Sequence, residues 1–203
     1  MKIKDFPTPQ KDDADGNIII CRADEAADRA RDEKIVAVLS IEHPGVKEGE
    51  KGAAPRIEGV AQMILSFWDS EEEVENGPDQ RQIAEGIDFV LRHLSRGDVI
   101  IHCHAGKARS AAVALGVLAL RHPQEDAQQL IARLLAIRPI AAPNILVLAF
   151  ADAVAQRGGT LVAAVLADNA LTAARRDTAE GRARWQERHP EKFPPPKTQK
   201  PRH

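Results

Sequence analysis

The segment from Asp98 to Arg121 constrains the fold more than any other part of the chain. It begins with the largely apolar run of a strand, DVIIHC, and continues after a short loop as an alanine-rich helical pattern. A strand that is apolar on both faces is typical of a largely parallel sheet with helices on each side. The segment therefore predicts an α/β fold with this strand inside the sheet.

Short β-branched runs and amphipathic segments alternate through the rest of the chain. Together they predict a mostly parallel central sheet of about four or five strands flanked by helices. The stretch 42–59 is rich in Gly, Pro and charge, so we expect an exposed loop there. The other predicted strands are 17–22, 34–41 and 60–68, and the predicted helices are 23–33, 79–97, 109–121, 124–137, 144–156 and 160–176.

The length of 203 residues and the 43% hydrophobic content are sufficient for one sizeable core. We therefore expect a single catalytic domain over 18–157, preceded by an N-terminal extension, 1–17. A C-terminal helical extension is predicted over 158–180. The remainder, 181–203, is basic and proline-rich and is predicted to be a flexible tail.

Charge and composition exclude several classes of protein. A net charge of −2 gives no reason to expect binding to nucleic acid or to a membrane surface. No apolar run approaches the roughly 18 residues of a membrane span, and the N-terminus lacks the apolar core of a signal peptide. The only two cysteines, Cys21 and Cys103, are too few for a disulfide framework, which favours a reducing compartment and a cytoplasmic location.

The loop between the strand and the helix has the features of an anion site. Backbone N–H groups at a helix N-terminus point outward at an anion, and Gly106 permits the backbone angles that a curled loop needs. Arg109 can bind two phosphate oxygens at once. A helix N-terminus and a neighbouring cation can lower the pKa of a thiol from ~8.5 to roughly 3.5–7.5. Cys103 is therefore predicted to be a thiolate nucleophile.

The sequence HCHAGKARS resembles the His-Cys-five residues-Arg-Ser/Thr signature of the cysteine-dependent protein tyrosine and dual-specificity phosphatases. It is most similar to compact dual-specificity-like members, including bacterial ones, and the similarity extends from Ile18 to Asp152. The resemblance implies a metal-independent phosphomonoesterase with a phosphocysteine intermediate and no cofactor. Its substrate would be a phosphorylated protein or a small phosphate monoester. Phosphotyrosine, phosphoserine or phosphothreonine, a phosphoinositide and a nucleotide stay open, as does the oligomeric state.

By this resemblance, Cys103 is the nucleophile and Arg109 clamps the phosphate. Ser110 stabilises the thiolate when it leaves in the second step. Ala108 departs from the many relatives that have a small hydroxyl or glycine there, and it removes one possible hydrogen bond. The implied phosphate-binding positions are His104, Ala105, Gly106, Lys107, Ala108 and Arg109.

The mechanism of the family also requires an aspartic acid on a loop that follows a strand, to protonate the leaving oxygen. Asp69 has this context, and we expect it to be the general acid. Asp79 is a rival, but it resembles a helix N-cap after Pro78. Asp88 falls on the polar face of a predicted helix. A glutamate of the run 71–73 could substitute sterically.

Three further residues are expected to support the loop. His102 would orient it through its ring, and Arg138 and Asn144 lie in a segment, IRPIAAPN, that resembles the buttress of the phosphate loop in compact relatives. Helix termination and capping are the alternative roles for Arg138 and Asn144. His104 and Lys107 occupy variable loop positions.

Other functions stay open. A sulfurtransferase of the rhodanese type also places a cysteine in an anion-binding loop, and a catalytically weak module could bind phosphorylated partners. No metal site is expected, because adjacent residues such as His102 and His104 diverge from Cys103 and the sequence has no second close pair of Cys or His. Cys21 is expected to be a small core residue, with a disulfide to Cys103 on oxidation as an open alternative.

Overall fold

The computed structural model describes residues 16–188. Within them, β1 (Ile18–Arg22), β2 (Ile35–Glu42), β3 (Ala61–Ser66) and β4 (Asp98–Cys103) form one sheet. Its order is β1-β4-β2-β3, and every neighbouring pair is parallel. The predicted α/β fold with a parallel sheet is confirmed, and β4 lies inside the sheet, where it is almost entirely buried.

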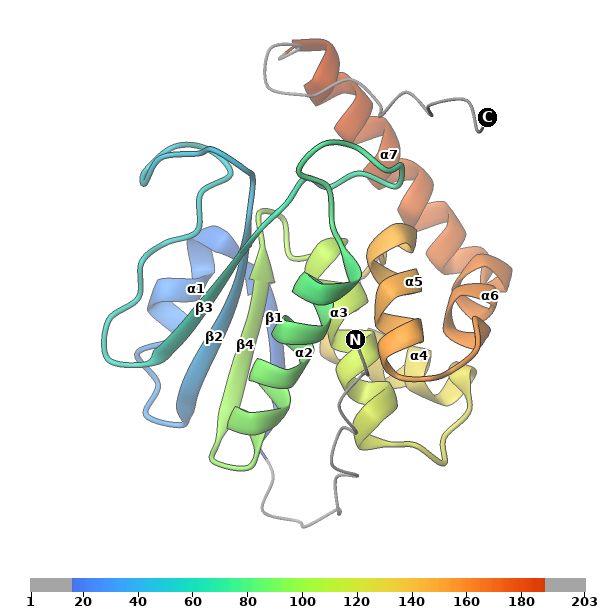
Figure 1. Ribbon diagram of the computed structural model, residues 1–203, viewed down its shortest axis with the longest axis horizontal. Coiled ribbons are helices and arrows are strands. Elements are labelled where there is room, and N and C mark those ends of the chain that lie inside the picture. The colour runs from blue at the N-terminus through green and yellow to red at the C-terminus, as the bar shows by residue number, and fades with distance from the viewer. Residues whose placement is uncertain (1–15, 189–203) are drawn as a thin grey trace, which may run out of the picture.

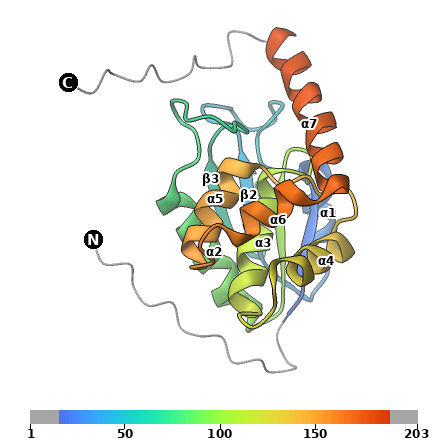
Figure 2. The same cartoon turned by 90° about the vertical axis from the view of Figure 1, so that its right-hand side faces the viewer.

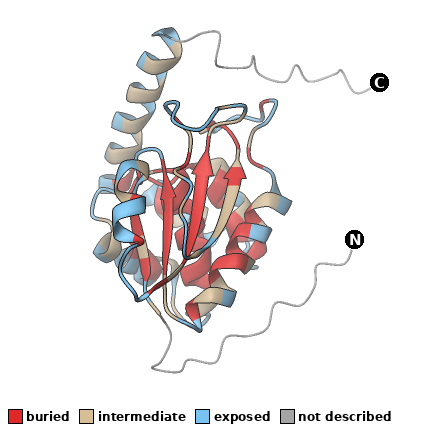
Figure 3. Ribbon diagram, turned by 90° about the vertical axis from the view of Figure 1, so that its left-hand side faces the viewer, coloured by how far each residue is buried: buried red, intermediate tan, exposed pale blue. Residues whose placement is uncertain are grey.

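Helices cover both faces of the sheet unequally (Figures 1 and 2). The short α1 (Ala23–Arg29) packs on one face with a small apolar cluster. Figure 3, seen from this side, shows that β1, β2 and β4 are largely buried, whereas β3 is mostly of intermediate exposure. The main core lies on the other face, under the helices α2 (Gln80–Leu94), α3 (Arg109–Arg121), α4 (Ala127–Ile137), α5 (Ile145–Val154) and α6 (Thr160–Ala167).

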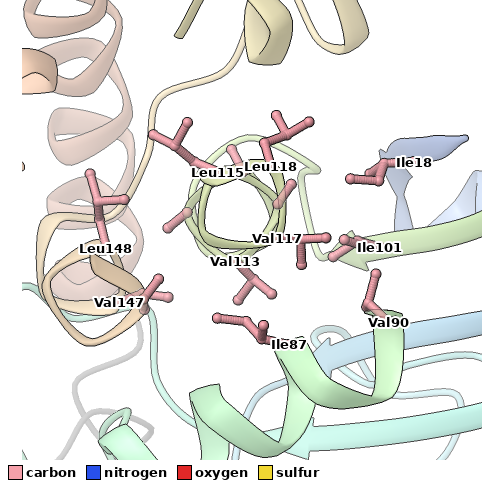
Figure 4. Close-up of a cluster of buried hydrophobic side chains, with 14 of the residues drawn as sticks. Ile18, Ile87, Val90, Ile101, Val113, Leu115, Val117, Leu118, Val147 and Leu148 are labelled. Atoms are coloured by element: carbon pink, nitrogen blue, oxygen red, sulfur yellow. The ribbon is translucent and has the colours of Figure 1, made fainter. Parts of the chain in front are cut away.

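Helix α3 is the centre of that core. Its residues from Arg109 to Ala119 are all buried, and its apolar side chains point in every direction toward α2, α5 and the sheet (Figure 4). A helix that is apolar all round is a buried helix. Small residues allow close neighbours here, since a Cβ on Gly116 would lie 2.8 Å from the Cβ of Ala151 on α5.

The C-terminal part of the chain differs from the prediction. The expected helix 160–176 is two helices, because the Asp168 carboxylate accepts a hydrogen bond from the Leu171 amide at 2.9 Å and caps a new helix. This helix, α7, spans Asn169–Arg188. It therefore continues past the boundary that we predicted at residue 180, into the segment expected to be a flexible tail. Residues 1–15 of the N-terminal extension and residues 189–203 lie outside the described part of the chain.

The topology brings the carboxyl ends of the strands together at one edge. Because all four strands are parallel, their last residues lie at this edge. These residues are Arg22, Glu42, Ser66 and Cys103. The helix after β1 covers one face of the sheet and the helix after the adjacent β4 covers the other, so the loops that leave these two strands diverge at this edge. Between residues 16 and 188, no helix has the length and apolarity needed to cross a bilayer.

The central position of α3 makes its large side chains the most costly to truncate. Leu115 is fully buried, whereas Leu166 on α6 is 51% exposed. We expect Leu115→Ala to lower the free energy of unfolding by about 2–5 kcal/mol, measured by urea denaturation. The matched change Leu166→Ala should alter it by no more than about 0.5 kcal/mol. Equal effects of the two changes would contradict the assigned core.

Candidate active site

The loop 104–108 joins β4 to α3, and four of its carbonyl groups accept hydrogen bonds from other parts of the protein. The His104 carbonyl accepts from the Ala23 amide at 3.4 Å, and the Lys107 carbonyl from Ala142 at 2.8 Å. The Gly106 carbonyl accepts from Arg138 Nε at 3.0 Å. The Ala108 carbonyl accepts from Asn144 at 3.3 Å and, within the helix, from Ala112 at 3.0 Å.

These contacts orient the amide groups of the loop. In a trans peptide the C=O and the following N–H point in opposite directions. The N–H groups that follow these carbonyls therefore point away from the protein groups that bind the carbonyls. They belong to Ala105, Lys107, Ala108 and Arg109. The N-cap of α3, Ala108, makes no side-chain capping bond. The loop thus has the arrangement expected of an anion site at a helix N-terminus.

Gly106 is required by this geometry. Its φ is +62°, and a Cβ at this position would lie 2.3 Å from the Cys21 carbonyl oxygen of the adjacent strand β1. Only glycine fits both the left-handed backbone and the close approach. The glycine predicted to permit a curled loop therefore also lets the loop pack on β1.

Cys103 ends β4 below the loop, and its thiol is buried. Its Sγ lies 3.3 Å from the Ser110 Oγ. Burial by itself raises the pKa of the Cys103 thiol, but the charge of Arg109 and the hydrogen bonds from Ser110 outweigh it, so the pKa lies below its ordinary value. A thiol with a lowered pKa is a candidate nucleophile.

Arg109 is almost completely buried, with 1% of its surface exposed. Its Nη1 donates to the Phe67 carbonyl at 2.8 Å and to the Glu42 carbonyl at 3.0 Å. Its Nε is buried and has no hydrogen-bond partner among residues 16–188. A buried donor of this kind is costly unless an acceptor is supplied, and an anion in the loop is a suitable acceptor.

Asp69 lies on the loop 67–79, called here the Asp69 loop, which joins β3 to α2. Its Oδ1 accepts from Asn144 Nδ2 at 2.8 Å and lies 3.7 Å from Arg182 Nη1. The negative charge of Asp69 raises the pKa of the Cys103 thiol, but by less than Arg109 and Ser110 lower it. Asp69 therefore lies within electrostatic range of the thiol.

The rival carboxylates have other contacts. Asp79 is the N-cap of α2, with its carboxylate bonded to the Gln82 amide at 2.9 Å, as expected. Asp88 pairs with Arg92 at 2.9 Å on the exposed side of the same helix. Glu71 is held by Arg175 of α7. Among Asp69, Asp79, Asp88 and Glu71, only Asp69 has a resolved electrostatic effect on the Cys103 thiol.

The expected supporting residues contact different parts of the site. Arg138 donates to the Gly106 carbonyl of the loop and is also the C-cap of α4. The Asn144 amide bonds the end of that loop, but its side chain binds Asp69 and the Ser70 carbonyl and caps α5 through Val147. Asn144 therefore links the 104–108 loop to the Asp69 loop.

The His102 ring points to the neighbouring strand. Its Nε2 lies 2.8 Å from the Ser40 Oγ on β2, and Ser40 also accepts from Gln62 Nε2 at 2.9 Å. Burial lowers the pKa of His102 to about 4, so the ring is neutral near pH 7. We expected the ring to orient the loop; its hydrogen bond to Ser40 connects β4 with β2, and the bond between Ser40 and Gln62 extends this connection to β3.

The two side chains at variable positions of the loop differ in exposure. His104 is exposed and Lys107 is half-buried.

Cys21 packs in the small cluster beside α1, whereas Cys103 belongs to the main core on the other face of the sheet. Both are free thiols, and burial raises the pKa of Cys21 to about 12. In the described part of the chain, no three His, Cys, Asp or Glu side chains are grouped to hold a metal ion.

Sequence reasoning missed the contribution of α7 to this edge of the molecule. Arg182 donates to the Asp69 carbonyl at 2.9 Å, and the Trp185 ring lies 5.8 Å from that of His43. The signal was a stripe of helical spacing, Leu171, Arg175, Thr178, Arg182 and Trp185, which continues through the expected tail.

Gly106 is required both by its positive φ and by its close approach to Cys21, and this gives a test of the loop. Gly106→Ala adds a Cβ against Cys21, whereas Gly45 has a similar φ of +70° with nothing within 4 Å. We expect Gly106→Ala to weaken tungstate binding, measured by calorimetry, by about tenfold or more, the effect of losing one charge-assisted hydrogen bond. Gly45→Ala should leave the affinity unchanged, since it carries only the backbone cost of about 1–2 kcal/mol. Unchanged affinity in Gly106→Ala would show that the loop does not hold the anion.

Comparisons with known proteins identify the fold. No protein-family model and no curated protein sequence matches the chain. Among solved structures, human DUSP28 shares 15% identity over 69% of this chain and 92% of its own, with a TM-score of 0.54. A mouse putative dual specificity phosphatase complexed with zinc tungstate shares 19% over 78% and 94%, with a TM-score of 0.54.

A third similar structure is the human tyrosine phosphatase-like serine/threonine/tyrosine-interacting protein. It shares 16% identity over 68% of this chain and 89% of its own, with a TM-score of 0.56. At these identities the likeness concerns the fold. The three proteins share the architecture of the family that the HCHAGKARS segment resembles. The chain therefore has the fold of the cysteine-dependent protein tyrosine and dual-specificity phosphatases.

Proposed function

We propose that the protein is a phosphomonoesterase that hydrolyses phosphotyrosine or another phosphate monoester through a phosphocysteine intermediate. One observation carries the proposal: a buried cysteine with a lowered pKa ends a strand immediately before a helix N-terminus, with Arg109 and Ser110 beside it. The phosphatase fold supports the same reaction class. It gives no support to the alternative of a rhodanese-like sulfurtransferase.

The substrate phosphate would bind in the 104–108 loop. The amides of Ala105, Lys107, Ala108 and Arg109 would donate to its oxygens, together with the otherwise unpartnered Arg109 Nε. Because the Arg109 Nη1 is already held by two carbonyls, the guanidinium is oriented before the substrate arrives. Such preorganised donors stabilise the charge that develops on the transferring phosphoryl group.

In the first step, the Cys103 thiolate attacks phosphorus and forms the S–P bond while the bond to the leaving oxygen breaks. The leaving oxygen takes a proton from Asp69, which becomes a carboxylate. In the described part of the chain, both contacts to the Asp69 carboxyl go to Oδ1, so Oδ2 is the oxygen suited to carry that proton.

In the second step, water attacks the phosphocysteine and gives a proton to the Asp69 carboxylate. The S–P bond breaks, inorganic phosphate is released, and the thiolate is regenerated. The Ser110 hydroxyl, 3.3 Å from Sγ, would donate to the departing thiolate and lower the barrier of this step.

The proposed reaction needs no metal or cofactor. The free thiols of Cys21 and Cys103 agree with a reducing, cytoplasmic location.

The nucleophile can be tested by Cys103→Ser. We expect turnover of an aryl phosphate to be abolished, because a serine hydroxyl here has no base to activate it. Binding of vanadate or tungstate should persist, since the loop amides and Arg109 are unchanged. The measurements are steady-state kinetics with and without a chelator, and calorimetric titration of the anion.

Cys21→Ser is the matched control, because it changes the other buried cysteine on the opposite face of the sheet, and it should retain activity. Substantial turnover by Cys103→Ser would remove Cys103 from its role. Anion binding without turnover in the unmodified protein would instead favour a phosphate-binding module. Sensitivity to the chelator would contradict the metal-independent mechanism.

The general acid can be tested by Asp69→Asn. We expect it to slow hydrolysis of alkyl phosphates by about 10²–10⁴-fold, the usual contribution of a positioned acid. Activated aryl phosphates should be affected far less, because their leaving anions need little protonation. The basic limb of the pH profile of kcat/KM should also disappear. Asp79→Asn should do neither, because it changes only an N-cap worth about 1 kcal/mol. The reverse pattern would transfer the role to Asp79.

A further inference from the structure

Helix α7 leaves the core and runs past the edge of the sheet where the strands end (Figure 1). Leu171, near its start, is 99% buried. Residues spaced along the same face, at Arg175, Thr178, Arg182 and Trp185, are all partly buried, whereas Arg176, Ala183 and Arg184 are exposed. The partly buried stripe is therefore the face with which α7 contacts the rest of the protein.

Arg182 contacts Asp69 twice. Its Nη1 donates to the Asp69 backbone carbonyl at 2.9 Å and lies 3.7 Å from Oδ1 of the same residue. The Arg182 side chain is 16% exposed and that of Asp69 is 23% exposed. One guanidinium thus holds both the backbone and the carboxyl group of the residue to which we assign the proton transfer.

Arg175 holds the same loop two residues further on. Its Nη2 donates to both carboxylate oxygens of Glu71, at 3.1 and 2.9 Å. The Glu71 carboxylate also accepts from the Ile145 amide at the start of α5, at 3.3 Å. Arg175 is 15% exposed and Glu71 33%. The two arginines lie two helical turns apart and act on alternate residues of one loop.

The Asp69 loop needs such anchors. From Phe67 to Asp79 it contains no helix and only an isolated bridge residue, Val74. Its acidic sequence, DSEEEVEN, carries five carboxylates, which repel one another. Without opposite charges the loop would have many accessible conformations. Asn144 supplies a neutral anchor, and α7 supplies the cationic ones.

We propose that Arg182 is a positioning residue that holds Asp69 at the active site, with Arg175 as a second anchor through Glu71. Helix α7 is then a part of the active site although it lies outside the predicted catalytic domain. With Asn144 and Arg182 on the same oxygen, Oδ1, the opposite oxygen is presented to the leaving group. This inference rests on the proposed function of Asp69, but its first test does not require turnover.

That test is amide hydrogen exchange of the full chain, measured by mass spectrometry over residues 68–76. Arg182→Gln and Arg175→Gln should each accelerate exchange in this segment by about tenfold, the effect of losing one charge-assisted hydrogen bond. Arg184→Gln is the matched control: Arg184 lies on the same helix, its side chain is 62% exposed, and it pairs with Glu180 of the same helix. It should leave exchange in the segment unchanged. No acceleration in Arg182→Gln would overturn the proposal, whatever the enzyme hydrolyses.

The second test separates positioning from a structural role. Arg182→Gln should slow hydrolysis of alkyl phosphates by about 10-fold or more while activated aryl phosphates change little, because only the former depend on a placed acid. In an Asp69→Asn background, Arg182→Gln should have no further effect on either substrate. Equal slowing of both substrates, or full additivity in the double variant, would overturn the positioning role even if exchange increases. Failure of the proposed function itself would appear differently, as an absence of turnover in the unmodified protein.

Discussion

The buried charge of Arg109 is the interaction on which the rest of the site depends. Arg109 is the first residue of α3, and its Nη1 is held by the carbonyls of Glu42 and Phe67, which lie at the ends of β2 and β3. A buried charge is strongly unfavourable unless hydrogen-bonded partners compensate it. The two carbonyls therefore determine where α3 starts relative to the sheet, and the same charge lowers the pKa of Cys103.

The loops around this centre are each held by a polar group from a distant part of the chain. On one side, the Glu42 carboxylate accepts from the Ala54 amide at 3.0 Å and from Arg56 at 3.3 Å, which fastens the loop after β2. On the other side, Asn144 and α7 fasten the Asp69 loop. The rigid edge of the parallel sheet provides a common frame for both. Loops without regular structure acquire a defined shape here through side-chain contacts.

Much of the fold was predictable because it follows from local patterns. The β-branched runs indicated all four strands, and the apolar alanine-rich pattern indicated the buried α3. The placement of Asp79 as an N-cap also followed from its neighbours. The break at Asp168 and the extension of α7 to Arg188 were missed, although helically spaced residues continue as far as Trp185. A basic, proline-containing composition suggests disorder when its partners on other elements are unknown.

The sequence by itself determined which side chains gather at the central loop. Cys103, Gly106, Arg109 and Ser110 are close neighbours in the chain, and a strand, a loop and a helix bring them together locally. Only the tertiary structure decided which groups act on them from elsewhere. The carbonyl partners of Arg109, the contact of His102 with Ser40 and the hold of Arg182 on Asp69 join residues separated by long stretches of chain. Such contacts depend on how helices and strands pack, and no periodicity or motif within one segment encodes them.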